Sequence, residues 1–238
     1  MQDKKYLYAA VALVMLIAVY TFGKVPLIQH IYGSKAEAFA EESLFEQITM
    51  LPQEYKQDAS FGKYEAVLNF RSEYQVVGRA AYVDIYDTSF YFGFKSKQQE
   101  LNTVYNAVSP LDISLFIGQT AEDGNWQKIK VTHEYRVVRW RWSSADKVTL
   151  NRDEISNSHV IPASTAIRRG FDTISRGDIV YMKGFLLDWN PLGEFDDIDF
   201  KTALTAGEIA DFKLGGRVSG LCRYFYVTEL TVKGYAFK

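Results

Sequence analysis

The N-terminal part of the chain is dominated by an uncharged apolar run, Tyr6–Phe22, which contains no proline. As an α-helix that rises about 1.5 Å per residue, this run would be roughly 25 Å long, close to the hydrocarbon thickness of a bilayer, about 30 Å. A buried core helix is the less favourable interpretation of a terminal run this uniform in its apolarity. We therefore predict a transmembrane helix over Tyr6–Phe22.

The residues around this run favour a permanent anchor over a cleaved signal peptide. The nearest small-x-small triplet, Ala38–Ala40, lies well beyond Phe22, whereas a signal peptidase site follows the apolar region closely. Lys4 and Lys5, together with the amino terminus, slightly outnumber the lysines that follow the run. This charge difference favours a cytoplasmic N-terminus and an extracytoplasmic C-terminal domain.

After the anchor, good helix formers surround an imperfect helical stripe of apolar residues. This pattern predicts a helix from about Lys35 to Met50, ended by Pro52. The chain is then divided into an anchor over residues 1–23, a juxtamembrane helix or linker over residues 24–58, and a soluble α+β domain over residues 59–238.

Alternation of apolar and polar residues predicts strands at the beginning of the soluble domain. Ala66, Leu68 and Phe70 alternate with more polar neighbours, as in a half-buried strand. Gly78 interrupts the next aromatic and β-branched run, which predicts a bulge or a close backbone approach. The following polar segment, Lys95–Val108, is compatible with a helix.

The second half of the domain is the more strongly patterned. Ser164 or Thr165 is placed to cap a short helix. The run Ile179–Trp189 predicts a strand with Gly184 at its middle, and Leu221–Lys233 predicts a last strand. We expect an α+β fold that is mainly antiparallel, and the internal glycine is compatible with a small OB-like barrel, in which strands bend sharply.

The composition of the chain excludes several kinds of binding and metal site. The formal net charge of −2, from 27 basic and 29 acidic residues, gives no global attraction to nucleic acid. The single cysteine, Cys222, excludes an internal disulfide and a multi-cysteine metal site, and we interpret it as a small apolar core residue. The acidic run at 196–199 lacks the ligand spacing of an EF-hand. We expect no cofactor and no metal.

One stretch interleaves basic and aromatic residues and is the best local candidate for a ligand contact. It is EYRVVRWRW, at the end of the segment Trp126–Trp142, which reads as one or two strands. The candidate binding residues in it are Arg139, Trp140, Arg141 and Trp142. Guanidinium and indole planes stack on bases or sugar rings. The alternative is ordinary structure, with tryptophans in the core and arginines shielding an edge, and one strand does not make a groove.

The candidate catalytic residues are His159, Asp178 and Asp112. The chain has no Gly-x-Ser-x-Gly, no His-Glu-x-x-His and no Gly-rich phosphate loop. His159 is the sharpest polar candidate because it lies between small polar residues and Val160-Ile161-Pro162, and Asp178 or Asp112 would supply the acid beside it. The structural alternative is a histidine whose ring nitrogens bond the backbone and fix a turn.

The order of several short motifs resembles a family of uncharacterised bacterial proteins with one N-terminal membrane anchor. The motifs are Ser109-Pro110-Leu111-Asp112, Arg139-Trp140, Asn157-Ser158-His159-Val160-Ile161-Pro162-Ala163, Arg176-Gly177-Asp178-Ile179-Val180, Gly184 and Gly220-Leu221-Cys222. The resemblance covers roughly residues 109–227 and implies topology and location, with no known reaction. An acidic residue tends to follow the late cysteine in that family, whereas Arg223 follows it here.

These features predict a single-pass protein of the bacterial inner membrane, held by Tyr6–Phe22, whose extracytoplasmic domain binds an envelope protein or a glycan strand. A first alternative is a membrane-tethered hydrolase of an envelope substrate, with His159 as its base. A second alternative is a cytoplasmic-facing module that binds single-stranded nucleic acid through the Arg139–Trp142 strand.

Overall fold

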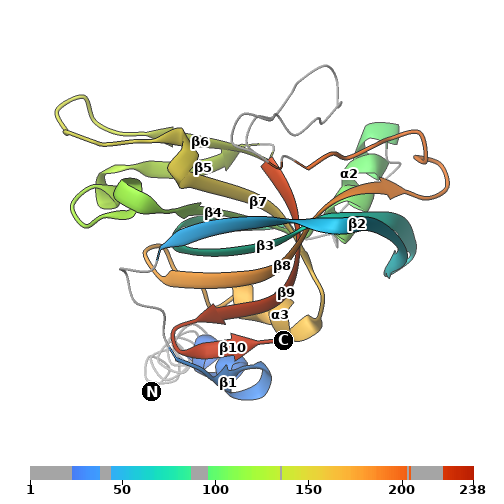
Figure 1. Ribbon diagram of the computed structural model, residues 1–238, viewed down its shortest axis with the longest axis horizontal. Helices are drawn as coiled ribbons and strands as arrows, with labels where there is room; N and C mark the ends of the chain where they lie inside the picture. Colours follow the sequence, from blue (N-terminus) through green and yellow to red (C-terminus); the bar gives the residue numbers. More distant parts are fainter. Residues whose placement is uncertain (1–22, 38–43, 87–95, 135, 203, 205–221) are drawn as a thin grey trace, which may run out of the picture.

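The computed structural model describes residues 23–37, 44–86, 96–134, 136–202, 204 and 222–238 (Figure 1). The fold is α+β, with a mainly antiparallel sheet and few helices. The strands are β1 (Ser34–Lys35), β2 (Phe45–Phe61), β3 (Tyr64–Ile85), β4 (Leu111–Phe116), β5 (Lys130–Glu134), β6 (Val137–Arg141), β7 (Ile155–Pro162), β8 (Ile179–Pro191), β9 (Cys222–Val232) and β10 (Tyr235–Phe237). The helices are α2 (Lys97–Val108) and α3 (Thr165–Phe171), with 3₁₀ turns at Gly118–Ala121, Trp126–Lys128 and Arg152–Glu154.

Five strand pairings form a closed ring. Strand β3 pairs with β4, β4 with β7, β7 with β9, β9 with β8, and β8 again with β3. All of these pairings are antiparallel except the parallel pairing of β7 with β9. Strands β10 and β1 extend the sheet beyond β9, β2 pairs with β3, and β5 and β6 form a separate hairpin beside β7 in Figure 1.

The ring strands β4 and β7 are buried on both faces. Alternate residues of β7 and β9, such as Val160 and Phe225, belong to one core cluster with residues of β3, β4 and β8. Their neighbours Ile161 and Tyr224 belong to a second cluster on the other face, where α2 packs through side chains such as Val104. This two-sided burial follows from the period of two along a strand.

Several sequence predictions are confirmed. Ala66, Leu68 and Phe70 are buried along β3, and α2 covers the segment expected to be helical. Helix α3 begins after Ser164, whose Oγ accepts a hydrogen bond from the Ile167 amide at 3.1 Å.

The irregularity predicted at Gly78 is also confirmed, and a second one is found at Gly184. A Cβ at position 78 would lie 2.8 Å from Leu115 Cβ, so β3 and β4 approach closely there. The β8–β9 register shifts between Lys183 and Gly184. Glycine at these two positions therefore permits close strand packing and a bulge.

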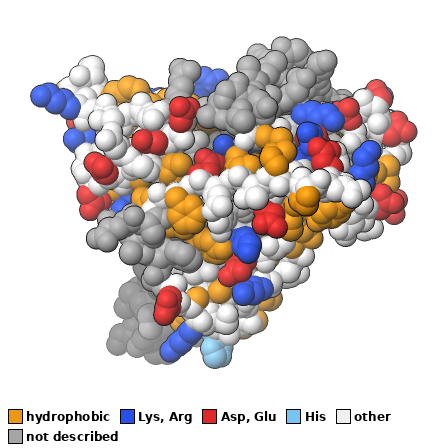
Figure 2. All heavy atoms as spheres, viewed as in Figure 1, with side chains coloured by type: hydrophobic (Ala, Val, Ile, Leu, Met, Phe, Trp, Pro, Cys, Tyr) orange, Lys and Arg blue, Asp and Glu red, His pale blue; other side chains and the backbone are white. Residues whose placement is uncertain are grey.

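The helix predicted over Lys35–Met50 is wrong. Lys35 belongs to β1, and Phe45–Met50 begins β2, in which Phe45 pairs with Val77 and Ile48 with Tyr74; residues 38–43 lie outside the described part. Helix propensity is a weak prior, and pairing along a free edge of β3 overrides it. Figure 2 shows hydrophobic side chains among charged ones on the face that β2 crosses, and Met50 and Tyr55 of β2 are exposed.

The predicted anchor, Tyr6–Phe22, lies outside the described residues. Among the helices that the structure describes, none has both the length and the apolarity needed to cross a membrane. Residues 23–32 are helical, and Ile28 within them packs into the core.

Candidate functional site

His159 and Asp112 lie opposite each other on β7 and β4. The His159 Nδ1 atom is 2.7 Å from Asp112 Oδ1. Asp112 is 0% and His159 is 2% exposed. Of the two acids expected to accompany His159, Asp112 is therefore the one that does.

Arg136 also contacts Asp112, from the turn between β5 and β6. Its Nη1 donates to Asp112 Oδ1 at 3.0 Å, and its Nη2 donates to the Ser109 carbonyl at 2.8 Å. The guanidinium carbon lies 3.8 Å from the ring centroid of Tyr86 and 4.0 Å from that of Tyr105. The hairpin tip is thus joined to the ring strands by one arginine.

The run EYRVVRWRW does not lie on a single strand but is divided by the turn between β5 and β6, and the two-strand alternative for Trp126–Trp142 is the one that fits. Arg136 has φ +63°, the left-handed conformation that a tight hairpin turn requires. The contacts of Arg136 with Asp112 and the two tyrosine rings stabilise this conformation, which local propensity disfavours for a residue with a Cβ.

The charges of Asp112 and His159 stabilise each other. Burial would raise the pKa of Asp112, but the positive charges of His159 and Arg136 hold that pKa below its usual value. Tyr86 Oη donates a further hydrogen bond to Asp112 Oδ2 at 2.8 Å. Burial opposes protonation of His159, yet the Asp112 carboxylate raises the pKa of His159 to about 9. At neutral pH the pair is a carboxylate and an imidazolium.

Cys222 completes this arrangement from β9. It lies opposite Asn157 in the parallel β7–β9 pairing, and Asn157 Nδ2 donates to its sulfur at 3.3 Å. The neighbouring Cys222 side chain also raises the pKa of His159. The sequence interpretation of Cys222 as an apolar filler missed this contact, because only the parallel pairing brings position 222 beside 157.

We call Asp112, Arg136, Asn157, His159 and Cys222 the polar cluster. Asn157 Oδ1 accepts from Ser114 Oγ at 2.8 Å, and Ser114 Oγ in turn lies 2.8 Å from His133 Nε2. Burial lowers the pKa of His133, so this histidine is neutral at pH 7. The cluster thus joins β4, β7, β9 and the β5–β6 turn through hydrogen bonds.

Asp178 lies apart from His159. Its Oδ2 accepts from the Ser175 amide at 2.6 Å and lies 3.0 Å from Lys233 Nζ. It precedes β8 and closes the turn after α3, which is a structural role for the Arg-Gly-Asp sequence.

The four residues of the basic and aromatic stretch lie in or after β6. Arg139 and Arg141 are exposed, Trp140 packs against a small apolar cluster, and Trp142 is 43% exposed. The stretch reaches the polar cluster through the turn residue Arg136, which precedes all four. Their role in binding stays a prediction.

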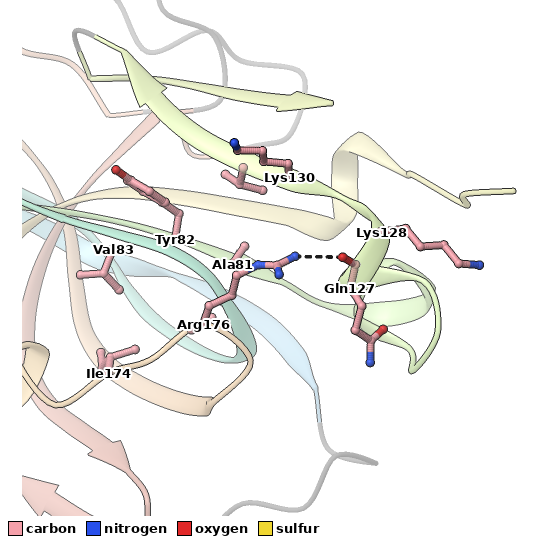
Figure 3. A pocket seen from close by; sticks show the side chains of 10 residues that line it. Ala81, Tyr82, Val83, Gln127, Lys128, Lys130, Ile174 and Arg176 are labelled. Atoms are coloured by element: carbon pink, nitrogen blue, oxygen red, sulfur yellow. Dashed lines mark hydrogen bonds between the residues drawn. The ribbon is translucent and has the colours of Figure 1, made fainter. Parts of the chain in front are cut away.

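A groove lies beside the β5–β6 hairpin, between β3 and the loop that follows α3. It has a volume of about 570 Å³, and its lining includes Tyr82, Lys130, Ile174 and Arg176 (Figure 3). Within the described ranges, no three His, Cys, Asp or Glu side chains are grouped so as to hold a metal ion. No protein-family model, curated protein or solved structure matches the chain.

Proposed function

We propose that the chain is a membrane-anchored protein of the bacterial cell envelope whose extracytoplasmic domain binds a protein partner or a glycan strand without catalysing a reaction. The anchor is the apolar run Tyr6–Phe22. One observation favours binding over catalysis: the candidate base His159 is 2% exposed and its Nδ1 lies 2.7 Å from Asp112 in a buried cluster. The carboxylate raises the pKa of His159 to about 9, which favours the imidazolium at neutral pH. A protonated imidazole does not act as a general base.

We further infer that the ring β3–β4–β7–β9–β8 is a small OB-like barrel. Five strands that close on themselves, with α3 between β7 and β8, support this inference. Such barrels display ligand-binding loops around a rigid ring of strands. The shared architecture transfers no ligand to this chain, so the partner has to be found by experiment.

Topology reporters test the location. Fusions of alkaline phosphatase and of green fluorescent protein after Lys35 and at Lys238 are expected to give phosphatase activity and no fluorescence. The opposite pattern would place the domain in the cytoplasm and would end the envelope proposal. A matched chain without residues 1–23 serves as the control, because it should lose the phosphatase signal.

Crosslinking tests the partner. Crosslinking in intact cells followed by mass spectrometry is expected to recover an envelope protein or peptidoglycan fragment with the full chain. A chain that stays uncrosslinked, together with a deletion strain that has an unaltered envelope, would contradict the binding role.

A second candidate, a membrane-tethered hydrolase, is favoured by one observation: His159 contacts both Asp112 and Cys222. In this reaction the Cys222 thiolate adds to the carbonyl carbon of an ester or amide. His159 protonates the departing oxygen or nitrogen, Asp112 orients the imidazole, and water then hydrolyses the acyl thioester. This candidate replaces the predicted role of His159 as a base with that of a proton donor.

Alkylation of the only cysteine tests the second candidate. A hydrolase is expected to react with iodoacetamide at pH 6 while folded, and His159→Gln should slow that reaction because it removes the imidazolium that favours the thiolate. Modification only after addition of denaturant would exclude Cys222 as a nucleophile. Cys222→Ser provides the unlabelled control.

A further inference from the structure

The groove beside β5 has cationic and apolar walls. Lys128, Lys130 and Arg176 line it, and no acidic side chain is among the described residues of the lining. Asp84, two residues along β3 from Tyr82, is outside the lining. An excess of positive charge in a concave site favours an anionic ligand.

Arg176 is a fixed cation in this groove. Its Nη2 donates to the carbonyls of Trp126 at 2.9 Å and Ile129 at 2.8 Å, and its guanidinium carbon lies 5.1 Å from the Trp126 ring centroid. Among the described residues no hydrogen bond uses its Nη1 or Nε. The carbonyls therefore hold the side chain in place while two of its nitrogen atoms keep donors for a ligand.

Lys130 is the second cation of the site. It is exposed on β5, and in the part of the chain that the structure describes no carboxylate lies within ion-pair distance of its ammonium group. Figure 3 shows Lys130 on the strand above Arg176, on the same side as Tyr82, whereas Lys128 extends away from the middle of the groove. Lys130 and Arg176 are thus two cations that line the same groove, one from β5 and one from the loop after α3.

The rest of the lining is largely apolar. Val83 of β3 and Ile174 of the loop after α3 contribute half-buried aliphatic side chains, with Ala80 and Ala81 beside them. Val131 of β5 also lines the groove, but its side chain packs into a neighbouring apolar cluster. A volume of about 570 Å³ is in the range of sites for small organic ligands. A glycan would need broad aromatic faces, and among the described lining residues Tyr82 is the only aromatic one, so an aliphatic body fits the walls better.

We propose that this groove binds an amphipathic anion, whose phosphate or carboxylate group is held by Lys130 and Arg176 and whose aliphatic body lies on Val83 and Ile174. This inference goes beyond the proposed envelope role and does not depend on it, because the lining residues are the same wherever the domain resides. The anionic group comes either from a soluble metabolite or from a membrane lipid.

Octyl phosphate is the probe. Equilibrium dialysis of radiolabelled octyl phosphate against the full chain, in buffer or in phosphatidylcholine nanodiscs with empty discs subtracted, is expected to show saturable binding. Butyl phosphate should bind about tenfold more weakly, because it buries less aliphatic surface. Inorganic phosphate and octanol, which each lack one half of the ligand, should not compete at the concentrations that saturate octyl phosphate.

The variant Lys130→Glu is expected to weaken octyl phosphate binding by about tenfold or more, since it places a negative charge beside the anion. Lys130→Gln should have a smaller effect of the same sign. Lys56→Glu is the matched control, because Lys56 is also an exposed lysine on a strand and lies on β2, away from the groove lining. Equal affinities of Lys130→Glu and Lys56→Glu, or equal binding of octanol and octyl phosphate, would overturn the proposal.

A second experiment distinguishes a soluble anion from a lipid headgroup. In it, anionic lipid is added to the nanodiscs. If phosphatidylglycerol displaces octyl phosphate from the unaltered chain and from Lys56→Glu, a lipid headgroup reaches the groove. If octyl phosphate binding is unchanged by phosphatidylglycerol and by phosphatidylserine at equal charge, the ligand is soluble. Either result supports the site, and failure of octyl phosphate to bind would leave the reporter and crosslinking results on the envelope role unaffected.

Discussion

Gly184 on β8 lies so close to the backbone of Tyr226 on β9 that a Cβ atom at position 184 would overlap the Tyr226 carbonyl oxygen. This contact coincides with the register shift in the β8–β9 pairing. The two strands can therefore approach at this point only because residue 184 has no side chain.

The first prediction concerns this contact. Gly184→Ala is expected to lower the free energy of unfolding by about 3 kcal/mol, because the strands must separate to admit the methyl group. Gly62→Ala is the control, because a methyl group at position 62 would meet no other atom within 4 Å. Only the backbone strain of φ +67° remains there, so this variant should lower the free energy of unfolding by about 1 kcal/mol. Urea unfolding measures both values, and an equal loss would contradict the close approach.

The second prediction concerns pH. The pKa of His159 is raised from 6.5 to about 9 in the folded protein, so its stabilising charge is fully present below pH 6.5 and is lost as the pH rises through about 9. The free energy of unfolding is expected to fall by about 3 kcal/mol over this window. Urea titrations between about pH 6 and 10 measure this fall.

The control for the pH dependence is the exposed histidine His30. His30→Gln should keep the slope between pH 6.5 and 9, whereas His159→Gln should flatten it. Parallel slopes for the two variants would show that His159 is not the titrating group.

The third prediction concerns Arg136. Arg136→Met is expected to lower the free energy of unfolding by about 3 kcal/mol, because the buried Asp112 carboxylate loses one of its charged partners. Arg141→Met, which changes an exposed arginine on β6, should stay within about 0.5 kcal/mol of the unaltered chain. Thermal and urea unfolding of the pair measures the difference, and similar losses would remove Arg136 from the polar cluster.

The fourth prediction compares two serines of β7. Ser158 is 0% exposed and its hydroxyl has no hydrogen-bond partner among the described residues, so Ser158→Ala should raise the free energy of unfolding by up to about 1 kcal/mol. Ser156 Oγ lies 2.8 Å from Tyr74 Oη, so Ser156→Ala removes a hydrogen bond and should lower the free energy of unfolding by about 1 kcal/mol. Urea unfolding of both variants measures these shifts, and changes of the same sign would contradict this difference in hydrogen bonding.

The sequence predicted those strands and helix ends that are determined by residues close together in the chain. The alternation at Ala66, Leu68 and Phe70 is a property of one strand, and the Ser164 cap is a property of one helix end. The strand β2 could not be predicted in this way, because its helix-forming composition is overridden by an edge of β3 that only the folded sheet presents.

The candidate site could be predicted only in part, because strand pairings bring its residues together from distant parts of the sequence. The sequence singled out His159 and Asp112, but it offered Asp178 as an equal alternative, and only the pairing of β4 with β7 separates the two acids. Arg136 was assigned to a strand, whereas a single residue of positive φ places it in a turn. The cationic groove joins β3, β5 and the loop after α3, and no local pattern connects those segments.

The parallel pairing of β7 with β9 determines the order of events when the chain is synthesised. Asn157 and Cys222 are 65 residues apart, so β7 leaves the ribosome well before the strand that covers its edge. At about 5–20 residues per second, the edge of β7 stays open for seconds. The ring therefore closes through a strongly non-local contact, and until it closes the open edge of β7 can pair with a chaperone or with another chain.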